Sequence, residues 1–257
     1  PQPPTWLRRQ RQMFIRDRNR TFRKICVIPA RGGSKRIHKK NIKPFLGSPI
    51  ISYSIKAAQE SGLFDEIMVS TDDNEIADIA INNGAKVPFL RSKKNADDFA
   101  TTVDVILEVL KKYESRGDKF DIGCCIYPTA PFVSNELLKN TYSYLLENNF
   151  DTVFPALQFS FPIQRAIKVK ENKRIELFEP EHQFTRSQDL EFAYHDAGQF
   201  YWFNLERLKE KKMLWTNNSG ITPLSEMQAH DIDTEEDWRI AEFKFKMYLN
   251  EKSRDLL

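Results

Sequence analysis

A glycine turn set among cations is the stretch of this chain best equipped to do chemistry. An apolar run over residues 24–29 leads into two glycines, a serine, an asparagine and several cations, namely Arg31, Gly32, Gly33, Ser34, Lys35, Lys40, Asn41 and Lys43. Successive backbone N–H groups in such a turn form a concave nest for an anion, and the cations add charge-assisted hydrogen bonds to phosphate oxygens. The pattern predicts a buried strand that ends in a loop for a nucleoside triphosphate.

Two better known phosphate motifs do not fit this loop. A Walker A loop ends in Gly-Lys-Ser/Thr, whereas here Ser34 precedes Lys35. A dinucleotide-binding fingerprint needs a third glycine, which the stretch lacks. The alternative to a phosphate site is a solvated basic turn that follows an edge strand.

Two aspartates near the end of the chain, Asp231 and Asp233, form the second chemical feature. They are two residues apart, so on a strand both carboxylates would face the same side. Such a pair suits Mg²⁺, which usually takes one or two protein carboxylates and completes its shell with substrate phosphates and water. The alternative is an acidic helix start, because Thr234 is followed three residues later by Asp237.

The segments that follow the loop alternate between strand and helix patterns. We expect a helix over residues 49–61, a strand over 64–71, a helix that ends at residues 83–84 and a short strand over 86–91. This alternation predicts a parallel sheet with crossover helices. Ligands of such sheets bind beyond the carboxyl ends of the strands, where the loop, residues 70–73 and Arg91 would meet.

The second half of the chain continues this organisation. We expect a helix from residue 103, a buried strand over 120–127, a helix over 135–148, a strand over 151–156 and an exposed hairpin over 167–178. The strand over 120–127 runs into a rigid proline turn that contains Pro128 and Thr129. From residue 226 we expect a strand that carries the two aspartates into a long C-terminal helix.

The composition is that of an ordinary globular protein of 257 residues, with 40% hydrophobic and 29% charged residues. No apolar run approaches the roughly 18 residues of a transmembrane helix. Cys26, Cys124 and Cys125 lie in apolar runs without metal-ligand spacing, so we expect reduced core residues of a cytoplasmic protein.

Residues 1–23 form a basic extension with seven arginines against one aspartate. A nucleic-acid or membrane-surface arm is one interpretation, and a disordered extension is the other. We favour the second, because the segment has no apolar signal-peptide core. The nucleic-acid-binding module remains the alternative from a different functional class.

Several motifs carry a resemblance to a known family. The run Ile-Pro-Ala-Arg-Gly-Gly-Ser-Lys at residues 28–35, followed by Lys39-Lys40-Asn41, resembles the opening signature of the CMP-sugar synthetases, or acylneuraminate cytidylyltransferases. The Asp-Ile-Asp-Thr run at residues 231–234 is similar to a later motif of that family. Residues 185–189 and 194–202 look most like its pseudaminic acid branch. The resemblance covers about residues 24 to 245 and leaves the N-terminal extension outside.

This resemblance implies a fold, a reaction and partners. The fold is α/β, a Rossmann-like three-layer nucleotidyltransferase (GT-A-like) architecture with a mostly parallel sheet. Residues 24–250 form the cytidylyltransferase domain, with a small lobe inserted at about 157–195 for dimerisation. The implied reaction joins CTP to a nonulosonic acid, with Mg²⁺ as cofactor, and the favoured sugar is pseudaminic acid. Sialic and legionaminic acid are the alternatives. A cytoplasmic homodimer that binds neither nucleic acid nor membrane is expected.

The resemblance also implies roles for single residues. The catalytic residues would be Arg31, Lys40, Asp231 and Asp233. The nucleotide would contact Arg31, Gly32, Gly33, Ser34, Lys35, Lys40, Asn41, Arg91, Asp98, Pro128 and Thr129. The sugar would contact Tyr127, Arg165, Arg186, Gln199 and Tyr201. Tyr127 departs from the sialic acid relatives, many of which have glutamine at this position. Arginine suits the sugar carboxylate because its planar fork binds carboxylates bidentately.

Overall fold

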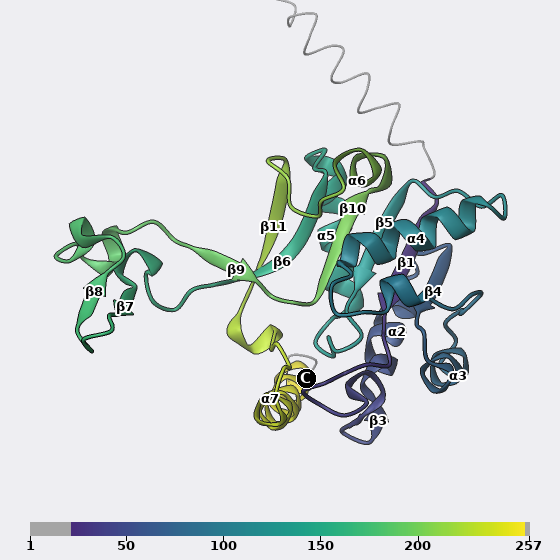
Figure 1. Ribbon diagram of the computed structural model, residues 1–257, viewed down its shortest axis with the longest axis horizontal. Coiled ribbons are helices and arrows are strands. Elements are labelled where there is room, and N and C mark those ends of the chain that lie inside the picture. Colours follow the sequence, from purple (N-terminus) through teal and green to yellow (C-terminus); the bar gives the residue numbers. More distant parts are fainter. Residues whose placement is uncertain (1–21, 255–257) are drawn as a thin grey trace, which may run out of the picture.

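A seven-stranded sheet forms the centre of the computed structural model, which describes residues 22–254 (Figure 1). Its strands are β1 (Lys24–Pro29), β4 (Glu66–Ser70), β5 (Ile122–Ile126), β6 (Thr152–Gln158), β9 (Tyr194–Asp196), β10 (Phe200–Asn204) and β11 (Ser219–Leu224). The strand order is β11-β6-β10-β5-β1-β4, and β9 pairs with β6. β10 and β9 run antiparallel to their partners, and the other pairs are parallel. The predicted mostly parallel sheet is confirmed.

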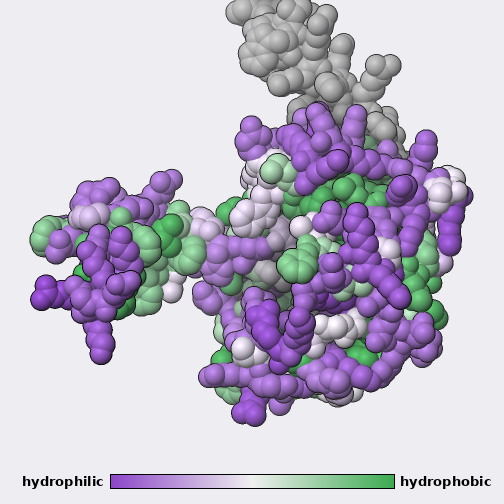
Figure 2. Space-filling model, viewed as in Figure 1, coloured by the Kyte–Doolittle hydropathy of each residue, from purple (hydrophilic) through white to green (hydrophobic). Residues whose placement is uncertain are grey.

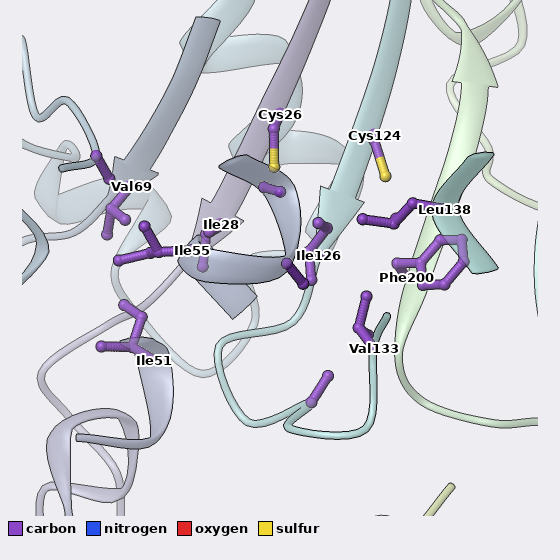
Figure 3. Packing of buried hydrophobic residues seen from close by; sticks show 14 of the residues in the cluster. Cys26, Ile28, Ile51, Ile55, Val69, Cys124, Ile126, Val133, Leu138 and Phe200 are labelled. Carbon is purple, nitrogen blue, oxygen red and sulfur yellow. The ribbon is translucent and has the colours of Figure 1, made fainter. Parts of the chain in front are cut away.

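Helices pack on both faces of this sheet. α2 (Ile50–Ser61), α3 (Asn74–Asn82) and α5 (Asn135–Glu147) share one buried cluster with Cys26 and Ile28 of β1 (Figure 3). α4 (Thr102–Glu114) and α6 (Leu205–Lys211) share another with Ile25 and Val27. Alternate residues of β1 therefore face opposite layers, as the pleat of a strand requires. The result is a three-layer α/β fold whose central strands are buried on both sides.

Local capping agrees with the predicted helix boundaries. Asp73 begins α3, and its carboxylate accepts hydrogen bonds from the backbone N–H groups of Glu75 and Ile76. Thr101 and Asp104 form a capping box at the start of α4. α2 ends at Gly62, whose φ of 62° lies in the left-handed region.

Two predicted strands are wrong. Residues 86–91 make only an isolated bridge, in which Lys86 pairs with Met68. The ladder stops there because Pro88 has no N–H to donate. The segment that carries the aspartates begins with the 3₁₀ helix η6 (Glu226–Gln228) and continues as irregular chain. The strand at the edge of the sheet beside β6 is instead β11, and Pro223 is tolerated there because an edge strand pairs on one side only.

The C-terminal helix α7 (Glu235–Arg254) is fixed against the loop that follows β1. Phe45, from the two-residue strand β2 (Pro44–Phe45) that pairs with β3 (Ser48–Pro49), packs edge-on against Trp238 at 5.7 Å and Phe245 at 5.6 Å. Ile37 and Ile232 lie in the same cluster. This packing holds the aspartate segment beside the first loop, although about 190 residues separate them in the chain.

An arm, residues 159–193, projects from the ends of β6 and β9 (Figure 1). It contains the antiparallel hairpin of β7 (Ile167–Val169) and β8 (Ile175–Leu177), together with the 3₁₀ helices η3 (Ile163–Arg165), η4 (Pro180–His182) and η5 (Ser187–Asp189). The predicted hairpin is confirmed. Hydrophobic residues lie on its surface among hydrophilic ones (Figure 2), and Phe161 and Phe184 are 81% and 90% exposed.

The predicted basic extension lies outside the described residues, except for Phe22 and Arg23. The Arg23 backbone N–H donates to Asp121 at 2.9 Å, and its guanidinium pairs with Asp118 at 3.2 Å. In the part of the chain that is described, no helix combines the length and the apolar character needed to cross a bilayer.

Replacing Gly123 with alanine is expected to lower the free energy of unfolding by about 1–3 kcal/mol. The added Cβ would lie 2.3 Å from a ring carbon of the buried Phe203, on the strand beside β5. Urea denaturation followed by circular dichroism measures the change. Gly33→Ala is the matched control, because no atom lies within 4 Å of its added Cβ, and its stability should not fall. An unfolding midpoint for Gly123→Ala equal to that of the wild type would contradict this packing.

Candidate active site

A cavity of about 410 Å³, here called the loop cavity, lies beyond the carboxyl ends of β1 and β5. The backbone N–H of Ala30 donates to the carbonyl of Ser70 at 2.9 Å, which ties the first loop to the end of β4. The cavity brings together many of the residues that the sequence assigns to a nucleotide, namely Arg31, Ser34, Lys35, Lys40, Asn41, Asp98 and Thr129. Arg36 also lines it, although Arg36 was not among the predicted site residues.

A second cavity of about 200 Å³ adjoins the first, and we call it the Tyr127 cavity. Pro29, Arg31 and Asp98 line both. Its other lining residues include Arg91, Thr102 and Tyr127, of which Thr102 was not predicted. One cavity is therefore rich in cations, while the other combines a guanidinium with hydroxyl and apolar groups.

At one side of the loop cavity, the Asp98 carboxylate occupies the position that a bound anion would take. Asp98 pairs with Arg31 at 2.7 Å and with the ammonium of Lys35. The hydrogen bond from Lys35, followed by the contacts with Arg31, holds the pKa of Asp98 below its ordinary value. Both cations are thus neutralised by a side chain that a phosphate would have to replace.

At the other side of the loop, cations pair with Asp233, one of the two aspartates near the end of the chain. Asp233 contacts Arg36 at 2.7 Å and Lys40 at 3.3 Å. Its own backbone N–H donates to the Asp237 carboxylate at 3.1 Å, which fixes it at the start of α7. The predicted meeting of the first loop with Asp233 is therefore present in the structure.

The predicted anion nest of the glycine turn is not formed. The Gly32 N–H donates to the Asp72 carboxylate at 3.0 Å, and the Ser34 N–H donates to the Gly32 carbonyl at 3.0 Å. Gly32 is required for another reason, because a Cβ there would lie 2.8 Å from a carboxylate oxygen of Asp73. The turn presents its cationic side chains to the cavity, and Asp72 takes the backbone donor that a phosphate was expected to use.

Asp231 and Asp233 have the chemistry of a divalent-cation site. Desolvation, and then the charge of Asp233, raise the pKa of Asp231 above its ordinary value, although the side chain remains accessible to solvent. Two carboxylates that repel each other in this way gain from a shared cation. Within residues 22–254 no group of three or more metal-ligating side chains is found, so the remaining oxygen ligands would come from substrate and water. The residues fit Mg²⁺ in that manner.

Arg91 and Asn41 hold the chain around the two cavities in place through hydrogen bonds. Arg91 is buried, and its Nε donates to the Ser70 hydroxyl at 3.1 Å. Burial is the largest influence on its guanidinium and lowers its pKa, whereas the charge of Asp72 acts in the opposite direction. The Asn41 amide donates to the Arg31 carbonyl at 2.9 Å and holds the loop in its turn.

The residues predicted for the sugar lie in two separate groups, because Tyr127 contacts Gln199 and Tyr201 at the sheet whereas the two arginines lie elsewhere. Arg165 and Arg186 belong to the arm, where Arg165 reaches the Ser187 hydroxyl at 3.5 Å. Gln199 is buried at 2% exposure, and its amide donates to the Gln228 carbonyl at 2.6 Å. Tyr201 is also buried and donates to Asp196. Only Tyr127 lines either cavity.

The fold and the two joined cavities define a nucleotide-binding α/β protein that has cations for phosphates and a carboxylate pair beside them. Residues 25–239 match the model of the family described as Cytidylyltransferase, and the chain belongs to that family.

Curated relatives agree with this assignment. The chain is 41% identical over 226 residues to the pseudaminic acid cytidylyltransferase of Campylobacter jejuni, a match that covers 88% of this chain and 97% of the relative. It is 32% identical to the CMP-N,N'-diacetyllegionaminic acid synthase of Legionella pneumophila, with coverage of 86% and 95%.

Solved structures share the fold at low sequence identity. A CMP:2-keto-3-deoxy-manno-octonic acid synthetase complexed with CTP aligns with a TM-score of 0.63 at 15% identity, over 89% of this chain and 99% of that one. The 4-diphosphocytidyl-2C-methyl-D-erythritol synthase of Anaerococcus prevotii aligns with a TM-score of 0.60 at 14% identity, over 88% and 96%. The predicted nucleotidyltransferase fold is thereby confirmed.

Asp98→Asn is expected to lower the KM for CTP severalfold, because the neutral amide no longer competes with phosphate for Arg31 and Lys35. Steady-state kinetics at fixed ionic strength measure this change. Asp78→Asn, on the exposed side of α3, removes the same charge away from the loop and is the matched control. A raised KM for Asp98→Asn would show instead that the carboxylate itself binds the ligand.

Proposed function

We propose that this protein transfers the CMP group of CTP to pseudaminic acid and releases pyrophosphate. The observation that carries the proposal is the division of the loop cations between Asp98 and Asp233 around one cavity. The choice of sugar is supported by the relative from Campylobacter jejuni, which matches nearly its whole length. A legionaminic acid is the second candidate, supported by the relative from Legionella pneumophila at lower identity.

The two cavities suit different parts of CTP. The loop cavity would take the triphosphate, because Arg31, Lys35 and Lys40 can each exchange a carboxylate for phosphate oxygens. The Tyr127 cavity would take the base, since Arg91 offers donors to ring acceptors while Ala100 and Val105 offer apolar surface. Because Arg31 lines both cavities, it would lie near the α-phosphate, which joins the nucleoside to the other two phosphates.

The chemistry requires no protein nucleophile. The anomeric hydroxyl of the sugar attacks the α-phosphorus and gives up its proton to water, the new C–O–P link forms, and the bond to the bridging oxygen breaks as pyrophosphate leaves. Catalysis of such a transfer depends mainly on positioning and on neutralising charge. Arg31, Lys35 and Lys40 would stabilise the charge that develops on the departing pyrophosphate.

Asp231 and Asp233 would hold Mg²⁺ next to the triphosphate. When bound, such an ion polarises the α-phosphate and lowers the pKa of the attacking hydroxyl. Lys40, which now pairs with Asp233, would be free to follow the phosphates when the carboxylate turns to the ion.

The arm would complete the sugar side of the site in a homodimer. Its exposed apolar side chains need a partner surface, and Arg165 and Arg186 lie on the same arm. A second copy would cover the apolar residues and bring the arginines toward a sugar carboxylate. A cytoplasmic location is supported by three buried free thiols, which suit a reducing compartment.

Arg31→Ala and Asp233→Ala are each expected to reduce turnover by about 100-fold or more while the protein stays folded. Pyrophosphate release from CTP in the presence of pseudaminic, legionaminic and sialic acid measures the activity and identifies the sugar. Lys56→Ala, on the outer surface of α2, is the control for loss of a cation. Wild-type turnover by either variant would refute the role given to that residue, and inactivity of the wild type with the whole panel would refute the function.

Replacement of Phe161 and Phe184 by serine is expected to convert a dimer into monomers, because both side chains are largely exposed on the arm. Sedimentation equilibrium measures the mass of each form. Phe99→Ser, at an equally exposed phenylalanine outside the arm, should leave the mass unchanged. A monomeric wild type would rule out the arm-mediated dimer.

A further inference from the structure

Asp231 lies on a stretch of irregular chain, residues 229–234, between η6 and α7. A side chain on such a stretch has no ladder or helical hydrogen bonds to fix its backbone. A cation site nevertheless needs its ligands held within about 0.5 Å of their working positions. Contacts from other parts of the fold must therefore hold this aspartate in place.

The turn between β9 and β10 lies against one side of this stretch. Gln199, in that turn, donates from its amide nitrogen to the Gln228 carbonyl at 2.6 Å, three residues before Asp231. The Gln199 carbonyl accepts the Tyr127 N–H at 2.9 Å, which ties the turn to the end of β5. A Cβ built on Gly198 would lie 3.7 Å from a carboxylate oxygen of Asp231, so the turn also lies beside the carboxylate itself.

The surroundings of Gln199 suit a role in holding the backbone. The side chain is 2% exposed, so it offers little surface to a ligand. Its amide oxygen is buried, and no group among the described residues donates to it. An unpaired polar atom in the interior costs stability, so this end of the amide does not account for a glutamine here. The hydrogen bond from the amide nitrogen to the Gln228 carbonyl does.

The C-terminal helix α7 holds the same stretch from its other side. Lys244 donates from its ammonium group to the Ala229 carbonyl at 2.7 Å, two residues before Asp231. The Ala229 side chain is buried in one cluster with Leu157 of β6 and Ala197 of the β9–β10 turn. Two consecutive carbonyls before the aspartate are therefore fixed, one by the sheet and one by the helix.

We propose that Gln199 and Lys244 are positioning residues, which hold the chain before Asp231 so that its carboxylate can share a divalent cation with Asp233. Asp233 is fixed separately, by the hydrogen bond from its N–H to Asp237. The inference rests on the proposed function only in placing a cation at the two aspartates. Residues that orient metal ligands without touching the metal typically contribute about 10–100-fold to its affinity.

Methionine at either position tests the proposal, because its unbranched side chain fills similar space and cannot donate a hydrogen bond. Gln199→Met and Lys244→Met are each expected to raise the Kd for Mn²⁺, which prefers the same oxygen ligands as Mg²⁺, by about tenfold. Electron paramagnetic resonance of the free ion measures the Kd in titrations without CTP or sugar. Lys244→Arg should bind Mn²⁺ nearly as the wild type does, since a guanidinium can donate to the same carbonyl.

Matched controls change the same chemistry elsewhere. Gln59→Met also removes an amide that donates to a backbone carbonyl, that of Asn83 at 3.1 Å. Lys246→Met removes an exposed ammonium group from α7. Both should keep the wild-type Kd for Mn²⁺. Asp231→Asn gives the binding that other carboxylates of the protein contribute, and urea unfolding shows which variants are folded.

The Mn²⁺ titration separates this inference from the proposed reaction, because it needs neither substrate and can be read even if no sugar is turned over. A wild-type Kd in folded Gln199→Met and Lys244→Met would overturn the inference. So would equal binding by the wild type and Asp231→Asn. A Gln199→Met variant with an unchanged Kd and a raised KM for the sugar would return that residue to the sugar site. If Gln199→Met does not fold, Lys244→Met and its rescue by arginine decide the matter.

Discussion

Mutual repulsion among the cations of the first loop is the constraint on which the rest of the site depends. Arg31, Lys35, Arg36 and Lys40 line one cavity, and like charges held this close destabilise the fold unless anions offset them. Two carboxylates from opposite directions, Asp98 and Asp233, provide the counter-charge. The same arrangement prepares the loop for a polyanion, because each carboxylate holds its cations at the distance and in the direction that phosphate oxygens would need.

Packing far from the chemistry makes this electrostatic arrangement possible. The aromatic cluster around Phe45, Trp238 and Phe245 brings the start of α7 against the first loop, and Asp233 arrives with it. The three-layer sheet performs the equivalent task for the ends of β1, β4 and β5. Stability and activity are therefore linked at α7, since a loosened aromatic cluster would displace a carboxylate that the cations require.

The sequence was informative where a local pattern has a single physical cause. The alternation of strands and helices and the joint position of Arg31, Lys35 and Lys40 follow from periodicity and side-chain chemistry alone. The predictions failed where the local structure depends on contacts between residues far apart in the sequence. Pro88 ended an expected strand, and Asp72 took the backbone donor expected to bind phosphate.

The placement of the cysteines has a practical consequence for spectroscopy. Cys26, Cys124 and Cys125 are the chain's full complement of thiols, and all are buried in the sheet. Burial raises the pKa of each thiol, to about 12 for Cys125, so the nucleophilic thiolate is scarce and shielded. A cysteine introduced at the tip of the arm would then be the one site open to a maleimide dye, and the surroundings of the arm could be followed by fluorescence without first removing a native residue.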